Sequence, residues 1–191
     1  MSARDAWPLA APVRLFHFSD DPGIGCFVPR PVRVPSARPP GREWLNGPLV
    51  WAIDEAHQRL YLFPRDCPRI VVWSTAATVA ADRQRWLGRL APGLSAVAYV
   101  EQAWMPRIAA AALTRYELPP AGFRSLGDAG MHVSAQAVRP LRAEALTDLR
   151  AALHASGTEL RPVAALAPLR PVWNSSLHAS GIRLRHAAGW A

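Results

Sequence analysis

Short apolar runs bounded by turn residues alternate along the chain with stretches of helical periodicity. Runs of Val, Ile, Leu and aromatic residues between Pro, Gly, Asp or Asn predict strands. Apolar residues spaced three and four positions apart predict helices. We therefore expect strands at 13–18, 49–53, 70–73, 95–100, 113–118, 131–134, 138–141 and 159–162, a closing apolar stretch at 182–184, and helices at 54–63, 79–87, 102–112, 143–155 and 171–179.

Several of the expected strands follow one another without a helix between them. This order favours an α+β domain, with a mixed, mainly antiparallel sheet flanked by helices, over a doubly wound α/β fold. No linker divides the pattern, so we predict a loose leader at 1–12 and a single domain at 13–191. A Pro- and Arg-rich loop at about 29–48 interrupts this domain, because its six prolines exclude a helix or a central strand.

The type of the basic residues excludes more classes of chemistry than their number does. All 22 are arginine, and the net charge is +8. Without lysine, the chain cannot form a phosphate-binding loop that ends in Gly-Lys-Ser/Thr, a Schiff base or a pyridoxal attachment. The arginines are scattered among acids and form no basic arm or recognition helix, so GC-rich codon usage explains their number better than nucleic-acid binding does.

The cysteines and histidines point to no metal. Cys26 and Cys67 lie far apart, outside any CxxC pair, and no HExxH sequence or histidine pair at helical spacing occurs. The chain also has no apolar run long enough for a signal segment or a membrane span. We predict a cytoplasmic protein with no metal, no membrane association and two unpaired thiols.

Common nucleotide and hydrolase motifs are missing, which leaves the first strand as the place to look for chemistry. GIGCFV lacks the third glycine of the dinucleotide fingerprint, and no GxSxG elbow is present. In LFHFSDDPGI, the period-two geometry of a strand places Phe16 and Phe18 on one face and Leu15 and His17 on the other. His17 is then either a structural histidine satisfied by one backbone hydrogen bond or part of a site.

Several strings spread from Leu15 to Ala187 resemble a family of uncharacterised bacterial proteins, a domain of unknown function. They are LFHFSDDPGIGCFVPR, PLVWAIDEAHQRLYLFPRDCPRI, VSAQAVRPL and SGIRLRHA. At longer range, the first two strings are similar to the opening of ADP-ribosyltransferase-like folds. There a strand reads L-Y/F-H-F/Y-T/S before a turn, and a second strand reads V-Y/W-A-T/S before a helix.

This second resemblance implies NAD or ADP-ribose as the ligand. It assigns His17, with Ser19 two residues on, to the strand that hydrogen-bonds a ribose hydroxyl. Trp51 takes the aromatic position that packs on nicotinamide, and Tyr61 closes the other side of the ring. Arg14 and Arg65, which flank the two motifs together with Arg30 and Arg69, add guanidinium groups suited to a pyrophosphate or an RNA phosphate.

The catalytic acid of such folds has no counterpart in this sequence. The related string of the uncharacterised family resembles WVSREPV, with a glutamate where HVSAQAVRPL has Gln136. The resemblance thus pairs Gln136 with His17 as catalytic residues, but an amide cannot take a proton or offset positive charge. Asp128 and Glu144 are the nearest acids that could substitute.

Four interpretations stay open. The chain is an ADP-ribosyltransferase-like enzyme or NAD glycohydrolase, a non-catalytic nucleotide binder, a phosphate or RNA-end processing enzyme that uses His17 and arginines, or a scaffold with no ligand. Whether His17, Trp51 and Gln136 line a single cleft separates the ligand-binding interpretations from the scaffold.

Overall fold

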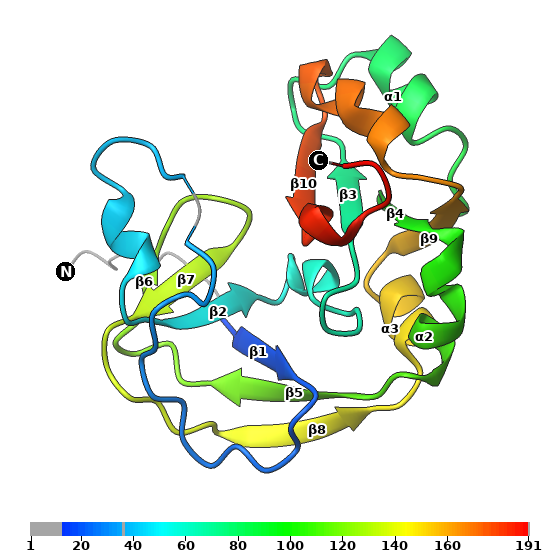
Figure 1. Cartoon of the computed structure of the whole chain (residues 1–191). Helices are drawn as coiled ribbons and strands as arrows, with labels where there is room; N and C mark the ends of the chain where they lie inside the picture. Colours follow the sequence, from blue (N-terminus) through cyan, green and yellow to red (C-terminus); the bar gives the residue numbers. More distant parts are fainter. Residues whose placement is uncertain (1–12, 36, 191) are drawn as a thin grey trace, which may run out of the picture.

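The computed structural model describes residues 13–35 and 37–190, and its strands form two sheets (Figure 1). The first sheet has six antiparallel strands in the order β6-β7-β2-β1-β5-β8, namely β6 (Arg124–Ser125), β7 (Met131–Ser134), β2 (Val50–Asp54), β1 (Leu15–Ser19), β5 (Leu113–Leu118) and β8 (Arg142–Leu146). The second has the order β10-β3-β4-β9, namely β10 (His178–Ile182), β3 (Arg69–Trp73), β4 (Ala96–Glu101) and β9 (Thr158–Val163), and its β4–β9 pair is parallel. The α+β class and the mainly antiparallel pairing are confirmed, although the strands divide between two sheets where one was expected.

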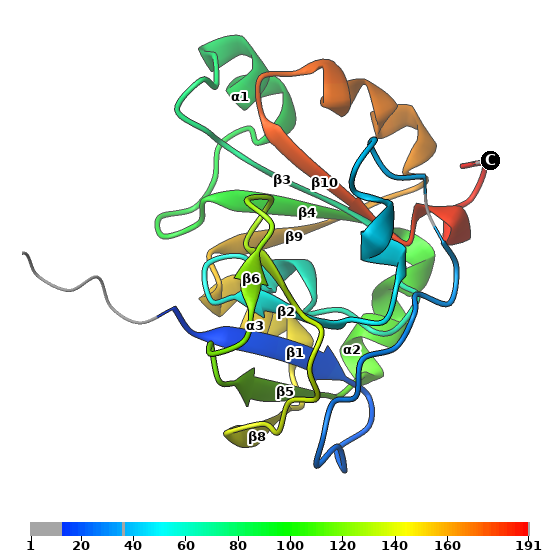
Figure 2. The ribbon, with the colours of Figure 1, turned by 90° about the vertical axis from the view of Figure 1, so that its left-hand side faces the viewer.

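The helices of the described residues are short. The α-helices are α1 (Ala80–Trp86), α2 (Met105–Ala110) and α3 (Leu149–Ala155), and the 3-10 helices are Glu43–Asn46, Gln58–Leu60, Gln102–Trp104, Ala167–Asn174 and Leu184–His186. Figures 1 and 2 show α1 and Ala167–Asn174 together at the end of the molecule farthest from β5 and β8. The predicted leader at 1–12 lies outside the described residues.

One apolar core joins the two sheets and makes the described residues a single compact domain. Its buried members come from β1, β2 and β5 of the first sheet, from β3 and β4 of the second, and from α2 and α3: Phe16, Ile53, Leu113, Val71, Ala98, Val100, Ile108, Leu149 and Leu153. A separate cluster under α1 packs on the opposite face of the second sheet. The sheets therefore stay apart as hydrogen-bonded units while their facing surfaces share one core.

The predicted secondary structure is wrong around residue 143. A helix was expected at 143–155 and a strand at 138–141, but the strand β8 comes first and α3 begins only at Leu149. Asp148 caps that helix by accepting a hydrogen bond from the backbone N–H of Ala151 at 2.9 Å. Val138 makes only an isolated bridge to Phe27. Pairing of β8 with the edge of β5 overrides the local helical periodicity.

Three other expected elements change form. The helix at 54–63 is a turn with one 3-10 helix, because the Asp54 side chain accepts from the backbone N–H of His57 at 2.8 Å and closes the turn locally. The Pro- and Arg-rich loop contains a 3-10 helix at its end, Glu43–Asn46. The helix expected at 171–179 ends at Asn174, and the strand β10 follows it.

The first strand pairs unequally with its two neighbours, and this positions the candidate site. On one side β1 pairs with β5 over all five residues. On the other it pairs with β2 only at Leu15↔Asp54 and Phe16↔Ile53. The two strands therefore part after Phe16, and the side chains beyond that point face an opening in the sheet.

Candidate functional site

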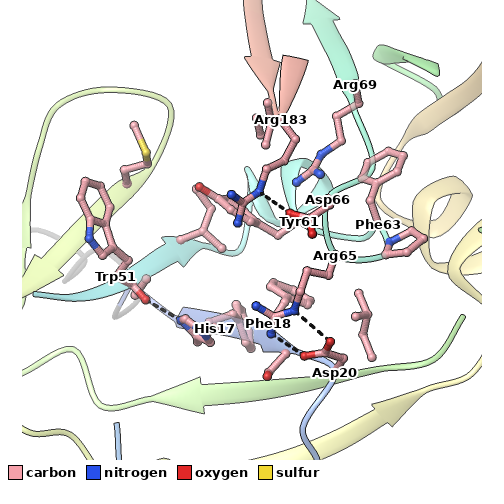
Figure 3. A pocket seen from close by; sticks show the side chains of 18 of the residues that line it. His17, Phe18, Asp20, Trp51, Tyr61, Phe63, Arg65, Asp66, Arg69 and Arg183 are labelled. Atoms are coloured by element: carbon pink, nitrogen blue, oxygen red, sulfur yellow. Dashed lines mark hydrogen bonds and ion pairs between the residues drawn. The ribbon is translucent and has the colours of Figure 1, made fainter. Parts of the chain in front are cut away.

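A cavity of about 490 Å³ lies where β1 and β2 separate (Figure 3). Side chains from β1, β2, the segment Tyr61–Asp66, the start of β3 and the end of β10 line it. Both sheets thus contribute to its walls. The volume falls within the range of small-molecule binding sites.

His17 is fixed at the point where the strands part. Its Nδ1 lies 2.8 Å from the carbonyl oxygen of Trp51. A carbonyl can only accept, so Nδ1 carries the proton and the lone pair is on Nε2. Burial lowers the pKa of His17, and the nearby Arg65 adds to this effect against the opposing bond to Trp51, so the ring is neutral at pH 7. No hydrogen-bond partner for Nε2 occurs among the described residues, which leaves a neutral acceptor in the cavity wall.

The period-two prediction for β1 is confirmed by packing on the two faces of the strand. Phe16 and Phe18 pack in the core that joins the sheets, and Leu15 belongs to the cluster on the opposite side. The His17 ring lies 4.7 Å from the ring of Phe27, a member of that second cluster. His17 reaches the cavity because β2 has moved away from this part of β1.

Aromatic side chains form much of the remaining wall. Trp51 and Tyr61 line the cavity together with Phe63. The indole N–H of Trp51 is buried and has no hydrogen-bond partner among the described residues. Burial raises the pKa of Tyr61, so its hydroxyl stays protonated. The wall therefore offers flat apolar surfaces with a few polar atoms among them.

Arg69 is a buried cation that pairs with no carboxylate among the described residues. Only 4% of the residue is exposed. Its guanidinium donates to the carbonyl oxygen of Leu60 at 2.9 Å and to that of Cys67 at 2.9 Å, and it lies 4.8 Å from the ring of Phe63. Burial lowers the pKa of Arg69 to about 10, so the group remains charged at pH 7. Figure 3 shows the guanidinium directed toward the cavity from the start of β3.

The charged groups of the cavity are mostly positive. Two aspartates line it, each beside an arginine: Arg65 donates to Asp20 at 2.9 Å, and Arg183 lies 3.6 Å from Asp66. The bond from Arg65 lowers the pKa of Asp20. Arg38 and Arg69 also line the cavity, so four arginines face two aspartates, an excess of two positive charges. This balance favours an anionic ligand.

Two residues of the rim have unusual backbone conformations. Asp66 has φ 65° and Arg183 has φ 57°, in the left-handed region that residues other than glycine seldom adopt. Such conformations cost about 1–3 kcal/mol and concentrate at functional sites. Both residues approach the cavity from different elements and face each other across 3.6 Å.

The structure brings together most of the residues singled out in the sequence, but not all. His17, Ser19, Trp51, Tyr61 and Arg65 line one cavity. The functional roles given to them stay predictions.

Arg14 and Gln136 do not line the cavity. Arg14 donates to Glu117 at 2.9 Å, and its guanidinium carbon lies 5.0 Å from the ring centre of Phe16. Gln136 is exposed beyond the end of β7, where its backbone N–H donates to the Ser134 hydroxyl at 3.1 Å in a tight turn. The expected catalytic pair of His17 and Gln136 is therefore not assembled in this cavity.

The substitute acids also lie elsewhere. Asp128 is exposed in the β6–β7 turn, and Glu144 pairs with Arg115 on the outer strands. The sequence analysis missed Asp20 and Asp66 as cavity residues and treated Arg69 only as a flanking cation. A usable signal for Arg69 was its position at the head of the apolar run RIVVW, where a charge enters a buried strand.

The cysteines are unpaired, as predicted. Burial raises the pKa of the Cys67 thiol to about 11. Within residues 13–35 and 37–190, no group of three or more His, Cys, Asp or Glu side chains could hold a metal ion. In the same part of the chain, every helix is too short or too polar to cross a membrane.

Comparison with known proteins gives a family and no activity. A family model described as a family of unknown function, DUF6886, matches residues 16–187, which is most of the chain. No curated protein and no solved structure matches the sequence.

Proposed function

Since the chain belongs to DUF6886, a family of unknown function, we propose its function from the cavity: it binds an anionic nucleotide of the NAD or ADP-ribose class. The proposal joins three properties of the cavity wall, namely a buried cation, a neutral imidazole and flat aromatic side chains. A nucleotide carries the matching groups, which are phosphate, ribose hydroxyls and a planar base.

The buried guanidinium of Arg69 is the observation that carries this proposal. Burial of an arginine without a carboxylate is costly, because carbonyl oxygens bear only partial charge. A guanidinium has five N–H groups, and three bonds to the carbonyls of Leu60 and Cys67 leave two for a ligand. A phosphate oxygen pair accepts from such a fork and supplies the missing negative charge.

The other lining groups suit the rest of a nucleotide. Nε2 of His17 would accept a hydrogen bond from a ribose hydroxyl, since that nitrogen is neutral and has its lone pair free. The rings of Trp51 and Tyr61 would pack against a base or a nicotinamide. Arg65 would remain bound to Asp20 and keep that carboxylate ionised beside the ligand.

Calorimetric titration with ADP-ribose and NAD tests the proposal. His17→Asn is the informative variant, because the asparagine amide can still donate to the Trp51 carbonyl while the acceptor at Nε2 is lost. We expect its Kd for ADP-ribose to rise about tenfold, the size of one hydrogen bond. Nicotinamide release, measured by chromatography in the NAD samples, reports turnover separately from binding.

His132→Asn is the matched control. His132 is also half-buried, and its Nδ1 lies 3.0 Å from the carbonyl oxygen of Gly130, but it lies on β7 outside the cavity lining. This variant should bind like the unchanged protein. If neither nucleotide gives a binding heat, or if both variants weaken binding equally, the cavity is not a nucleotide site and the scaffold interpretation gains.

A second candidate function is processing of a phosphorylated RNA end. It is favoured by one observation, the neutral His17 ring in the same cavity as Arg65 and Arg69. A neutral imidazole can take a proton while guanidinium groups hold the phosphate. Adding a 2′-phosphorylated oligonucleotide to the same series distinguishes the two candidates, because phosphate release that His17→Asn abolishes would favour this one.

A further inference from the structure

A surface that runs from the β6–β7 hairpin to the wall of the cavity combines arginines with tryptophans. We call it the arginine–tryptophan track, made up of Arg124, Trp44, Arg42, Arg38 and Trp51. It joins the β6–β7 hairpin to the Pro- and Arg-rich loop, which Figure 1 shows beside β6, and it ends at the wall of the cavity.

Specific contacts make this surface continuous. The guanidinium carbon of Arg124 lies 4.1 Å from the centre of the Trp44 ring. Arg42, two residues before Trp44, donates to the carbonyl oxygen of Leu126 at 3.3 Å and so ties the loop to the hairpin. The loop is thereby held along the hairpin.

The track reaches the cavity through Arg38. Its guanidinium carbon lies 5.8 Å from the ring centre of Trp51, and both residues line the cavity. Trp44 at the other end is 40% exposed. A ligand lying along the track could therefore contact an exposed aromatic ring at one end and the cavity wall at the other.

Few acids balance these cations. Between Pro22 and Ile53 the sequence contains four arginines and a single acid, Glu43. Arg38, Arg42 and Arg124 form no ion pair with any described residue, whereas six arginines elsewhere in the described part of the chain do. Glu43 in the loop and Asp128 in the hairpin are the acids nearest to these cations in the sequence, and the three arginines of the track outnumber them.

We propose that the track binds a single-stranded nucleic acid whose end enters the cavity. Proteins that hold single strands combine cations for the backbone with aromatic rings on which bases stack, and the track offers both. Phosphates would contact Arg42 and Arg124, and a base would stack on Trp44. The position of the strand end rests on the proposed function, whereas binding along the track does not.

Fluorescence anisotropy of a labelled single-stranded RNA tests the proposal with matched variants. One double variant is Arg42→Gln with Arg124→Gln, which leaves the cavity residue Arg38 in place. Its control is Arg83→Gln with Arg85→Gln on α1, which also removes two exposed arginines, one of them over a tryptophan, since Arg85 lies 4.9 Å from the Trp86 ring. Figures 1 and 2 show α1 away from β6.

The track variant should bind the RNA at least about tenfold more weakly than the control does. Losing two phosphate contacts should also reduce the magnitude of the slope of log K against log salt by about 1.4. Trp44→Ala leaves the charge unchanged, so it should weaken binding about fivefold or more without changing that slope. Thermal unfolding of each variant checks that it is folded.

Two results would overturn the proposal: no RNA binding by the unchanged protein, or equal weakening by the two double variants, which would show that net charge alone sets the affinity. Calorimetry with ADP-ribose on the track variant keeps the two proposals separate. Lost RNA binding with retained ADP-ribose binding supports the track. If the unchanged protein binds RNA but not ADP-ribose, and the track variant loses the RNA, the track is supported and the nucleotide proposal is removed.

Discussion

The outer strands β5 and β8 and the cavity contain the same cation in opposite settings. On the outer strands, Glu117 accepts from Arg14 at 2.9 Å and also from Arg142, and Glu144 pairs with Arg115. In the cavity wall, the hydrogen bonds of the Arg69 side chain to described residues all go to carbonyl oxygens. In this chain, the partners of an arginine therefore indicate its role, whereas the presence of an arginine alone does not.

The difference also separates folding from binding. Exposed ion pairs contribute about 0–1 kcal/mol each, so the outer pairs position strands without dominating stability. A buried guanidinium with two carbonyl partners satisfies backbone groups of the core and keeps its charge. Its positive charge therefore remains available to attract an anionic ligand.

Replacing Arg69 should have the largest effect. Arg69→Met leaves the carbonyl oxygens of Leu60 and Cys67 without their donor in the core. We expect the free energy of unfolding to fall by about 3 kcal/mol, and the Tm by about 6–12 °C, in thermal unfolding. Arg142→Met is the comparison variant and should cost below about 1 kcal/mol, because Arg142 is exposed and Glu117 keeps Arg14. If both variants lost the same free energy of unfolding, the buried and the exposed arginine would not differ in their contribution to stability.

Periodicity in the sequence predicted one part of the cavity wall. The alternation of β1 set the face of the strand on which His17 lies, because each strand sets its own alternation. Ser19, Trp51 and Tyr61 also line the cavity, but they were singled out by a resemblance and not by periodicity.

Residues that depend on the meeting of the two sheets could not be placed in the same way. Arg183 reaches the cavity from the end of β10, and Gln136 is turned away beyond β7. The expected helix at 143–155 failed for a related reason, since strand pairing at β5 competes with local preference. Sheet partners lie far apart in sequence, so periodicity carries no information about them.

Acid should selectively remove the contribution that the ion pairs of Glu117 make to the stability of the protein. The hydrogen bond from Arg14, with that from Arg142, lowers the pKa of Glu117 from 4.5 to about 2. A carboxyl whose folded pKa is lowered stabilises the protein above its unfolded pKa, and that contribution is lost as the pH falls from about 4.5 to about 2.

Urea unfolding of the unchanged protein and of Glu117→Gln measures this contribution. The difference between them should be largest at about pH 7, at or below about 1 kcal/mol, and should vanish near pH 2. A difference that persists in acid would mean that Glu117 stabilises β5 by packing, and the outer pairs would no longer contrast with Arg69 through charge.

The smallest expected effect belongs to the track. Arg42 is exposed, and its side-chain bond to the Leu126 carbonyl is long at 3.3 Å, so Arg42→Gln should change the free energy of unfolding by less than about 0.5 kcal/mol. Its neighbours in the track are also cations, so any change at low salt should favour the variant and should shrink as salt screens the repulsion. Thermal unfolding at low and physiological salt measures both. A loss above about 1 kcal/mol would place Arg42 with the structural arginines, because its side chain would then be needed to hold the loop on the hairpin.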